Sequence, residues 1–218
     1  MRVSTHAGDR GKTGLFSGER VSKAAERVHA CGEVDELNAV VGALAAVLQG
    51  SVAIPQELTA ELRAIQSELF RMGAWLSTTP GSPVSEELPR LDPDAVTRIE
   101  SAAERLESEL APLKGFILPG GDLTACWAHL ARTVCRRAER RVVAVLESTI
   151  AAKPARGTDL AQGSAGEAGE EQDADDMVQE SNVIELAVRY LNRLSDYFFV
   201  FALFCNHKKG VPEILWKP

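Results

Sequence analysis

Apolar residues recur at alternating steps of three and four along most of the chain, which is the spacing of one face of an α-helix. Three such runs lie in the first half: Val34, Leu37, Val41, Leu44 and Leu48; then Leu58, Leu62, Ile65, Leu69, Met72 and Leu76; then Val96, Ile99, Ala103, Leu106 and Leu110. A fourth helix is predicted over about 122–151 and a fifth over about 181–206. No stretch of sequence shows the alternation that is typical of a β-strand. The pattern predicts an all-α, five-helix bundle.

Glycine and proline residues mark the connections between these helices. The breaks fall at 50–55, at 80–93 and at 114–121, where the sequence reads K-G-F-I-L-P-G-G. Asp122 follows the last break and is a candidate N-cap, because its carboxylate can accept hydrogen bonds from free backbone N–H groups. The final segment, 210–218, carries apolar residues, and we expect it to dock against the bundle.

Two segments lack the helical spacing. Residues 1–24 are rich in Gly, Ser and Thr and are predicted to form a loop or extended arm. Residues 152–180 consist largely of Ala, Gly, Ser and acidic residues, which bury too little apolar surface to offset the entropy of ordering them. We therefore divide the chain into a glycine-rich arm at 1–24 and a helical domain at 25–218, with a flexible acidic loop at about 152–180.

The overall charge restricts the possible partners. The formal net charge is −7, whereas phosphate backbones and anionic lipid surfaces favour a positive protein. We expect neither nucleic acid nor a membrane as a partner, and no apolar stretch reaches the length of a membrane span. An anionic ligand therefore requires a local cluster of basic residues.

The cysteines show neither the C-x-x-C spacing of a zinc site nor the density of a disulfide framework. Reduced thiols in a cytoplasmic protein are the simplest interpretation of Cys31, Cys126, Cys135 and Cys205.

The main basic cluster is R-T-V-C-R-R-A-E-R-R at 132–141, with five arginines and one glutamate in ten residues. On a helix, Arg132, Arg136 and Glu139 fall within roughly 60° of one another, whereas Arg137 and Arg141 point elsewhere. Guanidinium groups bind phosphate oxygens in pairs, and a nearby carboxylate can contact Mg²⁺ through water. A solvated charged helix face is the alternative interpretation.

The arm offers a second phosphate-binding candidate, T-H-A-G-D-R-G-K-T-G at 5–14, which Ser22 and Lys23 extend. Its glycines allow backbone N–H groups to approach a phosphate, and Lys12 supplies charge. It is not a Walker A loop, because only two residues separate Gly8 from Gly11 and the expected strand and helix are missing from the pattern.

Two further polar groups fall on helices, and by themselves such groups are more often surface polar residues and core aromatics than part of a site. Asp35 and Asn38 lie one turn apart on the first helix, and Asn192, Asp196 and Phe199 lie together on the fifth. A di-iron centre would need two Glu-x-x-His motifs, and only 26–29 provides one.

These clusters coincide with a known family. Along nearly its whole length apart from 152–180, the chain resembles the PduO-type ATP:cob(I)alamin adenosyltransferases. The resemblance rests on six motifs in order: T-x-x-G-D-x-G-x-T-G-L-F at 5–16, R-V-S-K at 20–23, V-D-E-L-N at 34–38, F-I-L-P-G-G at 116–121, R-T-V-C-R-R-A-E-R-R at 132–141 and R-Y-L-N-R-L-S-D at 189–196.

The resemblance implies a ferritin-like five-helix bundle that forms a homotrimer with its sites between subunits. The implied ATP and Mg²⁺ site consists of Thr5, Gly8, Asp9, Gly11, Lys12, Thr13, Ser22, Lys23, Arg136, Glu139 and Asn192. Asp35 would pair with Arg132 across the interface in support of corrinoid binding, and Phe116 would cover the lower corrin face and displace its dimethylbenzimidazole ligand. The implied reaction transfers the adenosyl group of ATP to the cobalt of cob(I)alamin, which a reductase would supply and a cobalamin-dependent acceptor enzyme would use.

The sequence departs from the family pattern at a few positions. His6 and Ala7 replace a common basic residue and threonine, Cys31 replaces a common tyrosine, and Leu203 stands where an arginine is frequent. Two other classes remain as alternatives. A kinase-like phosphotransferase would need a base to activate its acceptor, and a helical scaffold would use the arginines to bind an acidic partner.

Overall fold

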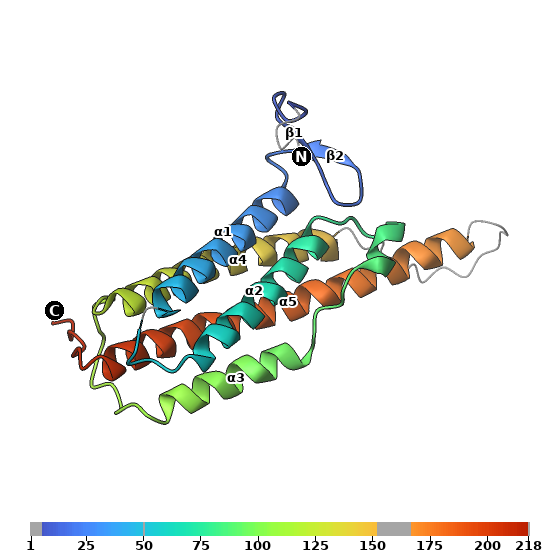
Figure 1. Ribbon diagram of the computed structural model, residues 1–218. Helices are drawn as coiled ribbons and strands as arrows, with labels where there is room; N and C mark the ends of the chain where they lie inside the picture. Colours follow the sequence, from blue (N-terminus) through green and yellow to red (C-terminus); the bar gives the residue numbers. More distant parts are fainter. Residues whose placement is uncertain (1–5, 50, 152–166, 218) are drawn as a thin grey trace.

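The computed structural model describes residues 6–49, 51–151 and 167–217, and helices dominate this part of the chain. Thr5 lies outside it, as does the stretch 152–166. The predicted all-α bundle is confirmed, because the described residues form five α-helices (Figure 1): α1 (Glu26–Gln49), α2 (Glu57–Leu76), α3 (Asp94–Glu107), α4 (Leu123–Ala151) and α5 (Glu167–Lys208).

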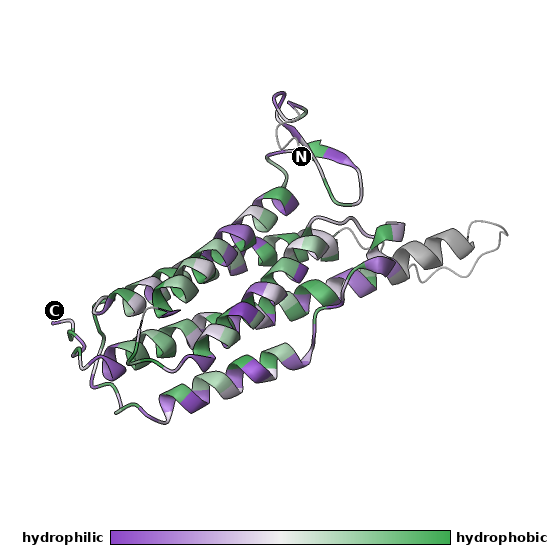
Figure 2. Ribbon diagram, in the orientation of Figure 1, coloured by the Kyte–Doolittle hydropathy of each residue, from purple (hydrophilic) through white to green (hydrophobic). Residues whose placement is uncertain are grey.

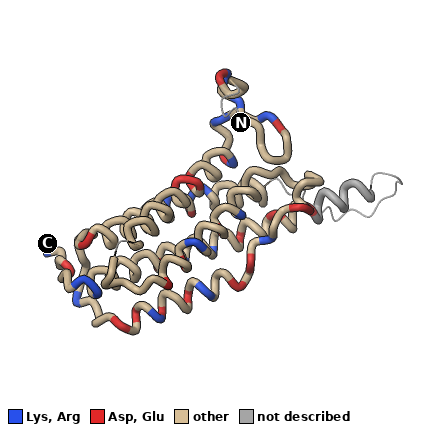
Figure 3. The backbone as a smooth tube through the Cα atoms, in the orientation of Figure 1, with Lys and Arg blue, Asp and Glu red and all other residues tan. Residues whose placement is uncertain are grey.

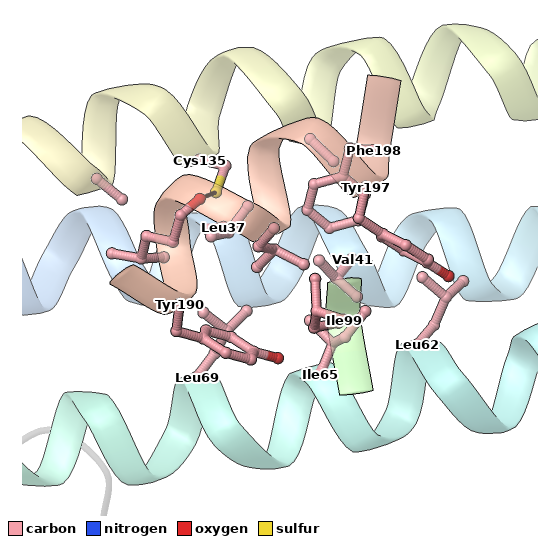
Figure 4. Packing of buried hydrophobic residues seen from close by; sticks show 14 of the residues in the cluster. Leu37, Val41, Leu62, Ile65, Leu69, Ile99, Cys135, Tyr190, Tyr197 and Phe198 are labelled. Carbon is pink, nitrogen blue, oxygen red and sulfur yellow. Dashed lines mark hydrogen bonds between the residues drawn. The ribbon is translucent and has the colours of Figure 1, made fainter. Parts of the chain in front are cut away.

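The core lies among α1, α2, α4 and α5, while α3 packs on α5. The predicted apolar runs of α1 and α2 are buried in full. Close packing around Tyr197 and Phe198 joins α5 to residues such as Val41 and Leu62 (Figure 4). Figure 2 shows polar residues interspersed with apolar ones along the helices, as expected for helices with one face in a core. The run of α3 is confirmed only in part, because the helix ends at Glu107 and Leu110 lies beyond it.

α5 begins at Glu167, earlier than the predicted start at 181, so residues 167–180 are helical and do not belong to a loop. Two features favour this helix. Its Glu, Ala and Gln residues are good helix formers, and buried Glu180 forms an ion pair with Arg27 of α1. The helix thereby gains a tertiary contact that composition does not reveal.

The arm contains a short hairpin that the sequence pattern did not predict. Strands β1 (Lys12–Gly14) and β2 (Arg20–Ser22) pair antiparallel, and the hairpin lies beyond the start of α1 (Figure 1). Three residues per strand are too few to show an alternation of polar and apolar positions. A 3₁₀ turn at Pro83–Glu87 interrupts the connection from α2 to α3.

The two predictions at the opposite end of the bundle are confirmed. Asp122 caps α4 by accepting a hydrogen bond from the N–H of Thr124 at 2.9 Å. The C-terminal segment docks on the loop before α4 through an antiparallel bridge between Ile117 and Leu215. Among the described residues, no helix has both the length and the apolar character that crossing a bilayer would require.

Candidate functional site

The arginine-rich stretch of α4 meets the polar residues of α5 at Glu139. The Glu139 Oε1 accepts a hydrogen bond from Asn192 Nδ2 at 3.0 Å, so the carboxylate is held in one orientation. Arg136 is exposed on the preceding turn of the same helix face. Because α4 and α5 pack along each other, two motifs more than fifty residues apart form one polar group.

The neighbouring arginines serve other contacts. Arg137 forms ion pairs with Glu33 and Glu36 of α1, and these hydrogen bonds raise its pKa. Arg140 donates to the backbone carbonyl of Arg136 at 2.9 Å. Figure 3 shows basic and acidic residues dispersed along the backbone of the bundle. Arg132 and Arg136 make no side-chain ion pair among the described residues, so the charges of these two residues remain available for a ligand.

Arg132 occupies a more enclosed position than Arg136. Burial, and then the positive charge of Arg136, lower its pKa. Its Nε is buried and makes no hydrogen bond within the described chain. A buried guanidinium N–H without an acceptor is costly, so this group is suited to a negatively charged partner.

The arm brings most of its predicted phosphate-binding residues together. Strand pairing sets Lys12 opposite Ser22 and Thr13 opposite Val21. The backbone N–H of Lys23 donates to the carbonyl of Gly11 at 2.9 Å.

Gly8 lies against the Lys23 side chain, so closely that a Cβ at Gly8 would stand 2.9 Å from Lys23 Nζ. Asp9 is exposed and faces His6 at 3.5 Å, and the carbonyl of Ala7 accepts from Arg20. The hairpin therefore gathers two ammonium groups and a glycine-rich backbone on one exposed element.

Phe116 lies at an open hollow in the loop that precedes α4, and 81% of its surface is exposed. The hollow is lined by Leu113, Gly115, Phe116, Ile117, Pro119, Arg132 and Phe199. Apart from Arg132, these residues offer hydrocarbon surface or backbone, which suits a large flat ligand with an apolar face.

His129 packs near Phe199, one of the residues that line this hollow, and is not among the predicted site residues. It is only 4% exposed, its ring centre is 6.2 Å from that of Phe199, and neither ring nitrogen has a hydrogen-bond partner among the described residues. Burial, and then the charge of Arg132, lower its pKa to about 4, so it is neutral at pH 7. In the sequence, only the position of His129 one turn before Arg132 on the same helix face indicates that it lies near the site.

The polar group on α1 divides into a structural residue and a free one. Asn38 and Gln66 exchange side-chain to backbone hydrogen bonds of 3.2 and 3.3 Å, which join α1 to α2. Asp35 is exposed, and no ion pair links it to Arg132 within the described single chain. The described residues also contain no cluster of three or more His, Cys, Asp or Glu side chains that could hold a metal.

Within one chain, no hydrogen bond among the described residues joins the arm to the arginine face, whereas Arg132 of that face also lines the apolar hollow. The described residues thus form a helical bundle with two regions that carry basic side chains and an apolar hollow beside one of them. The family model for cobalamin adenosyltransferases matches residues 3–158. The chain belongs to the cobalamin adenosyltransferase family.

Individual relatives agree over the full length. The chain is 36% identical to a corrinoid adenosyltransferase of Bacillus subtilis, with 98% of this chain and 91% of the relative covered. It is 34% identical to a cobalamin adenosyltransferase of Cupriavidus metallidurans, covering 99% and 94%. The fold also matches a variant of a PduO-type ATP:corrinoid adenosyltransferase from Lactobacillus reuteri complexed with cobalamin and ATP, with a TM-score of 0.75, 28% identity and full coverage of both chains.

Proposed function

We propose that this chain transfers the 5′-deoxyadenosyl group of ATP to the cobalt of cob(I)alamin, giving adenosylcobalamin and triphosphate. The observation that carries the proposal is the hydrogen bond between Glu139 and Asn192 beside exposed Arg136, because it assembles two motifs of the family on one face. The full-length relatives and the fold match support the same activity.

The triphosphate of ATP binds between the arm and the arginine face in this proposal. Lys12 and Lys23 supply positive charge on the hairpin, and the backbone of Gly8 and Gly11 permits close approach. Thr5, Asp9, Thr13 and Ser22 complete the arm's contribution, while Arg136 and Asn192 act from the helices. Guanidinium and ammonium groups stabilise the charge that develops as triphosphate leaves.

The Mg²⁺ that accompanies ATP fits this set of residues. Mg²⁺ is usually held by substrate phosphates, waters and one or two carboxylates, so it needs no cluster of protein ligands. Glu139 retains an oxygen beyond the one that accepts from Asn192, and it would contact the ion directly or through water. The ion would neutralise charge on the phosphates.

The corrinoid binds at the hollow beside Phe116 and Arg132. A corrin ring presents a broad apolar face, and the aromatic rings of Phe116 and Phe199 offer a matching surface. An exposed phenyl ring below the cobalt leaves no space for a nitrogen ligand there. Loss of that ligand removes electron density from the metal, which makes Co(II) easier to reduce.

The transfer itself needs no protein nucleophile. Co(I) attacks the ribose C5′ and supplies the electron pair of the new Co–C bond, while the C5′–O bond breaks and triphosphate leaves with that bond's electrons. The protein aligns the two substrates and stabilises the leaving group. This division of work explains why the candidate site contains cations and apolar surface and does not resemble a catalytic triad.

A homotrimer completes the site in this proposal. Among the described residues, no hydrogen bond joins the arm to the arginine face within one chain, and the buried Nε–H of Arg132 has no acceptor there. Asp35 of a neighbouring subunit would provide that acceptor. A reductase would supply Co(I) and an acceptor enzyme would receive the product. The four cysteines are all free thiols, which supports a cytoplasmic location.

The decisive experiment is anaerobic. Purified protein is mixed with Mg²⁺, ATP and chemically reduced cob(I)alamin, and the Co(I) absorbance is followed. We expect protein-dependent loss of that band, with light-sensitive adenosylcobalamin and triphosphate as products. Persistence of the band while ATP still binds would mean that the acceptor is wrong, and absence of binding of either ligand would favour a scaffold role.

Two arginine variants test the site. Arg136→Ala removes the cation from the proposed triphosphate site, whereas Arg141→Ala removes an exposed arginine of the same helix that points elsewhere. We expect a fall in turnover of about 100-fold or more for Arg136→Ala, comparable to the loss of one transition-state donor, and near-normal turnover for Arg141→Ala. Equal effects of both would indicate general electrostatics and contradict a specific role.

A further inference from the structure

Asn206, near the end of α5, ties together three segments of the chain. Its side chain is 1% exposed. Its Oδ1 accepts from the backbone N–H of Asp122 at 2.9 Å, and its Nδ2 donates to the carbonyl of Gly120 at 3.0 Å and to Glu213 Oε1 at 2.9 Å. One buried amide thus forms hydrogen bonds with a backbone N–H and a backbone carbonyl of the turn into α4, and it also binds the C-terminal segment.

The turn is shaped to admit this amide. Gly121 has a φ of +108°, and a Cβ there would lie 2.2 Å from Asn206 Oδ1. Glycine is therefore required at this position both for its conformation and for its lack of a side chain. The contact is specific to this pair of residues, because a bulkier residue at 121 would displace the amide.

The C-terminal segment in turn holds the backbone around Phe116. The N–H of Trp216 donates to the carbonyl of Phe116 at 2.8 Å, and the N–H of Leu118 donates to the carbonyl of Ile214 at 2.8 Å. The Phe116 ring itself is largely exposed, so its own packing does little to fix it. Its position depends on the backbone, and that backbone is held by the C-terminal segment on one side and by the Asn206 turn on the other.

We propose that Asn206 and the C-terminal segment, 211–217, position Phe116 for displacement of the lower ligand of the corrinoid. This inference rests on the proposed function. Asn206 does not touch the substrate; it acts through the turn at 120–122 and through Glu213. A ring displaced by about 1 Å would admit the nitrogen ligand again, and displacements of this size can cost about 100-fold in rate.

The test compares substrates with and without the lower ligand. Asn206→Ala removes the side-chain amide that binds the turn. Trp216→Pro removes the N–H that donates to the carbonyl of Phe116, and Trp216 lies in an exposed segment outside the core. Each variant is assayed with Co(II) cobalamin and a chemical reductant, and with cobinamide, which lacks the dimethylbenzimidazole. The absorbance and electron paramagnetic resonance of bound Co(II) report whether the nitrogen ligand has left.

We expect the kcat of both variants with cobalamin to fall about ten-fold or more. We also expect a smaller signal from Co(II) that has lost its nitrogen ligand. The activity with cobinamide and the KM for ATP stay within about two-fold of the wild-type values, a much smaller change than the loss of kcat with cobalamin. His207→Ala, at an exposed neighbouring position, behaves as wild type, and Trp216→Ala, which keeps the N–H, retains more activity than Trp216→Pro.

Three results separate the possibilities. An equal loss with both corrinoids, accompanied by a lower unfolding midpoint, would overturn the positioning role in favour of a general structural one. Wild-type behaviour of both variants would overturn it as well. If the wild-type protein itself transfers no adenosyl group, the proposed function fails and not merely this inference.

Discussion

Partly or fully enclosed polar groups set the properties of the site at the scale of single residues. Glu139 is held by Asn192, Arg132 has an N–H without a partner, and His129 is enclosed without hydrogen bonds among the described residues. Enclosing polar groups costs free energy, so a substitution at each of these residues is expected to show its role.

His129 makes folding stability dependent on pH. Its pKa falls from 6.5 to about 4 in the folded protein because burial disfavours the charged ring. Between these values the unfolded chain binds a proton that the native state does not, so stability is lost as pH falls from about 6.5 to about 4, by at most about 3 kcal/mol.

Urea unfolding at several pH values measures this effect. His129→Gln is neutral throughout and should show a shallower decline over that range, whereas His207→Gln, at an exposed histidine, should decline like the wild type. Identical slopes for His129→Gln and the wild type would contradict the assignment.

Asn192→Asp tests the contact with Glu139. The substitution replaces a donor 3.0 Å from a carboxylate oxygen with a second carboxylate, and the two negative charges repel each other near the proposed triphosphate site. We expect KM for ATP to rise about ten-fold or more, as the loss of about 1.4 kcal/mol of binding would produce. Steady-state kinetics provide the measurement. Asn182→Asp adds the same charge at an exposed position of α5 and should leave KM unchanged.

At the scale of elements, the hairpin arm is the part of the protein that presents charge without contributing to the core. Its strands are three residues long, its residues are mostly exposed, and its geometry depends on the pairing of Lys12 with Ser22. Changes there should alter ligand binding much more than stability, because little apolar surface is buried.

Lys23→Gln therefore separates binding from folding. Removing the ammonium group beside Gly8 should raise KM for ATP about ten-fold, since a charge-assisted hydrogen bond contributes roughly 1.5–3 kcal/mol, and should leave the unfolding midpoint unchanged. Arg10→Gln removes a charge from the same arm outside the hairpin strands and is the matched control. An equal rise in KM for both variants would indicate attraction by the arm's net charge only.

At the scale of the whole molecule, the proposal places the site between subunits. No hydrogen bond or ion pair among the described residues joins Asp35 or the arm to Arg132 or Arg136, and the proposed homotrimer should have a mass in solution of about three times 23.5 kDa. Sedimentation equilibrium measures this mass directly.

Mixing two inactive variants tests the division of the site. Asp35→Ala and Arg136→Ala subunits, exchanged by partial denaturation and refolding, should regain part of the activity, because some interfaces receive an intact Asp35 and an intact Arg136. Each variant refolded alone is the control. No recovery, despite mixed trimers, would mean that both residues serve a site within one subunit.

The sequence by itself determined the helices and most of their buried faces. The runs on α1 and α2 are buried as predicted, because burial of an apolar stripe at helical spacing is the dominant local preference of such segments. The motifs also identify the family. Two boundaries were wrong: α3 ends before Leu110, and α5 begins at Glu167, where the pairing of Glu180 with Arg27 adds a stabilising contact.

Only the tertiary structure decided which polar residues meet. The hydrogen bond between Glu139 and Asn192, the enclosure of His129 and the junction at Asn206 each join segments distant in sequence. Spacing along one helix defines a face but not what packs against that face. Burial and hydrogen bonding are properties of the packed chain, and for that reason the anchoring of Phe116 by the C-terminal segment could be found only in the structure.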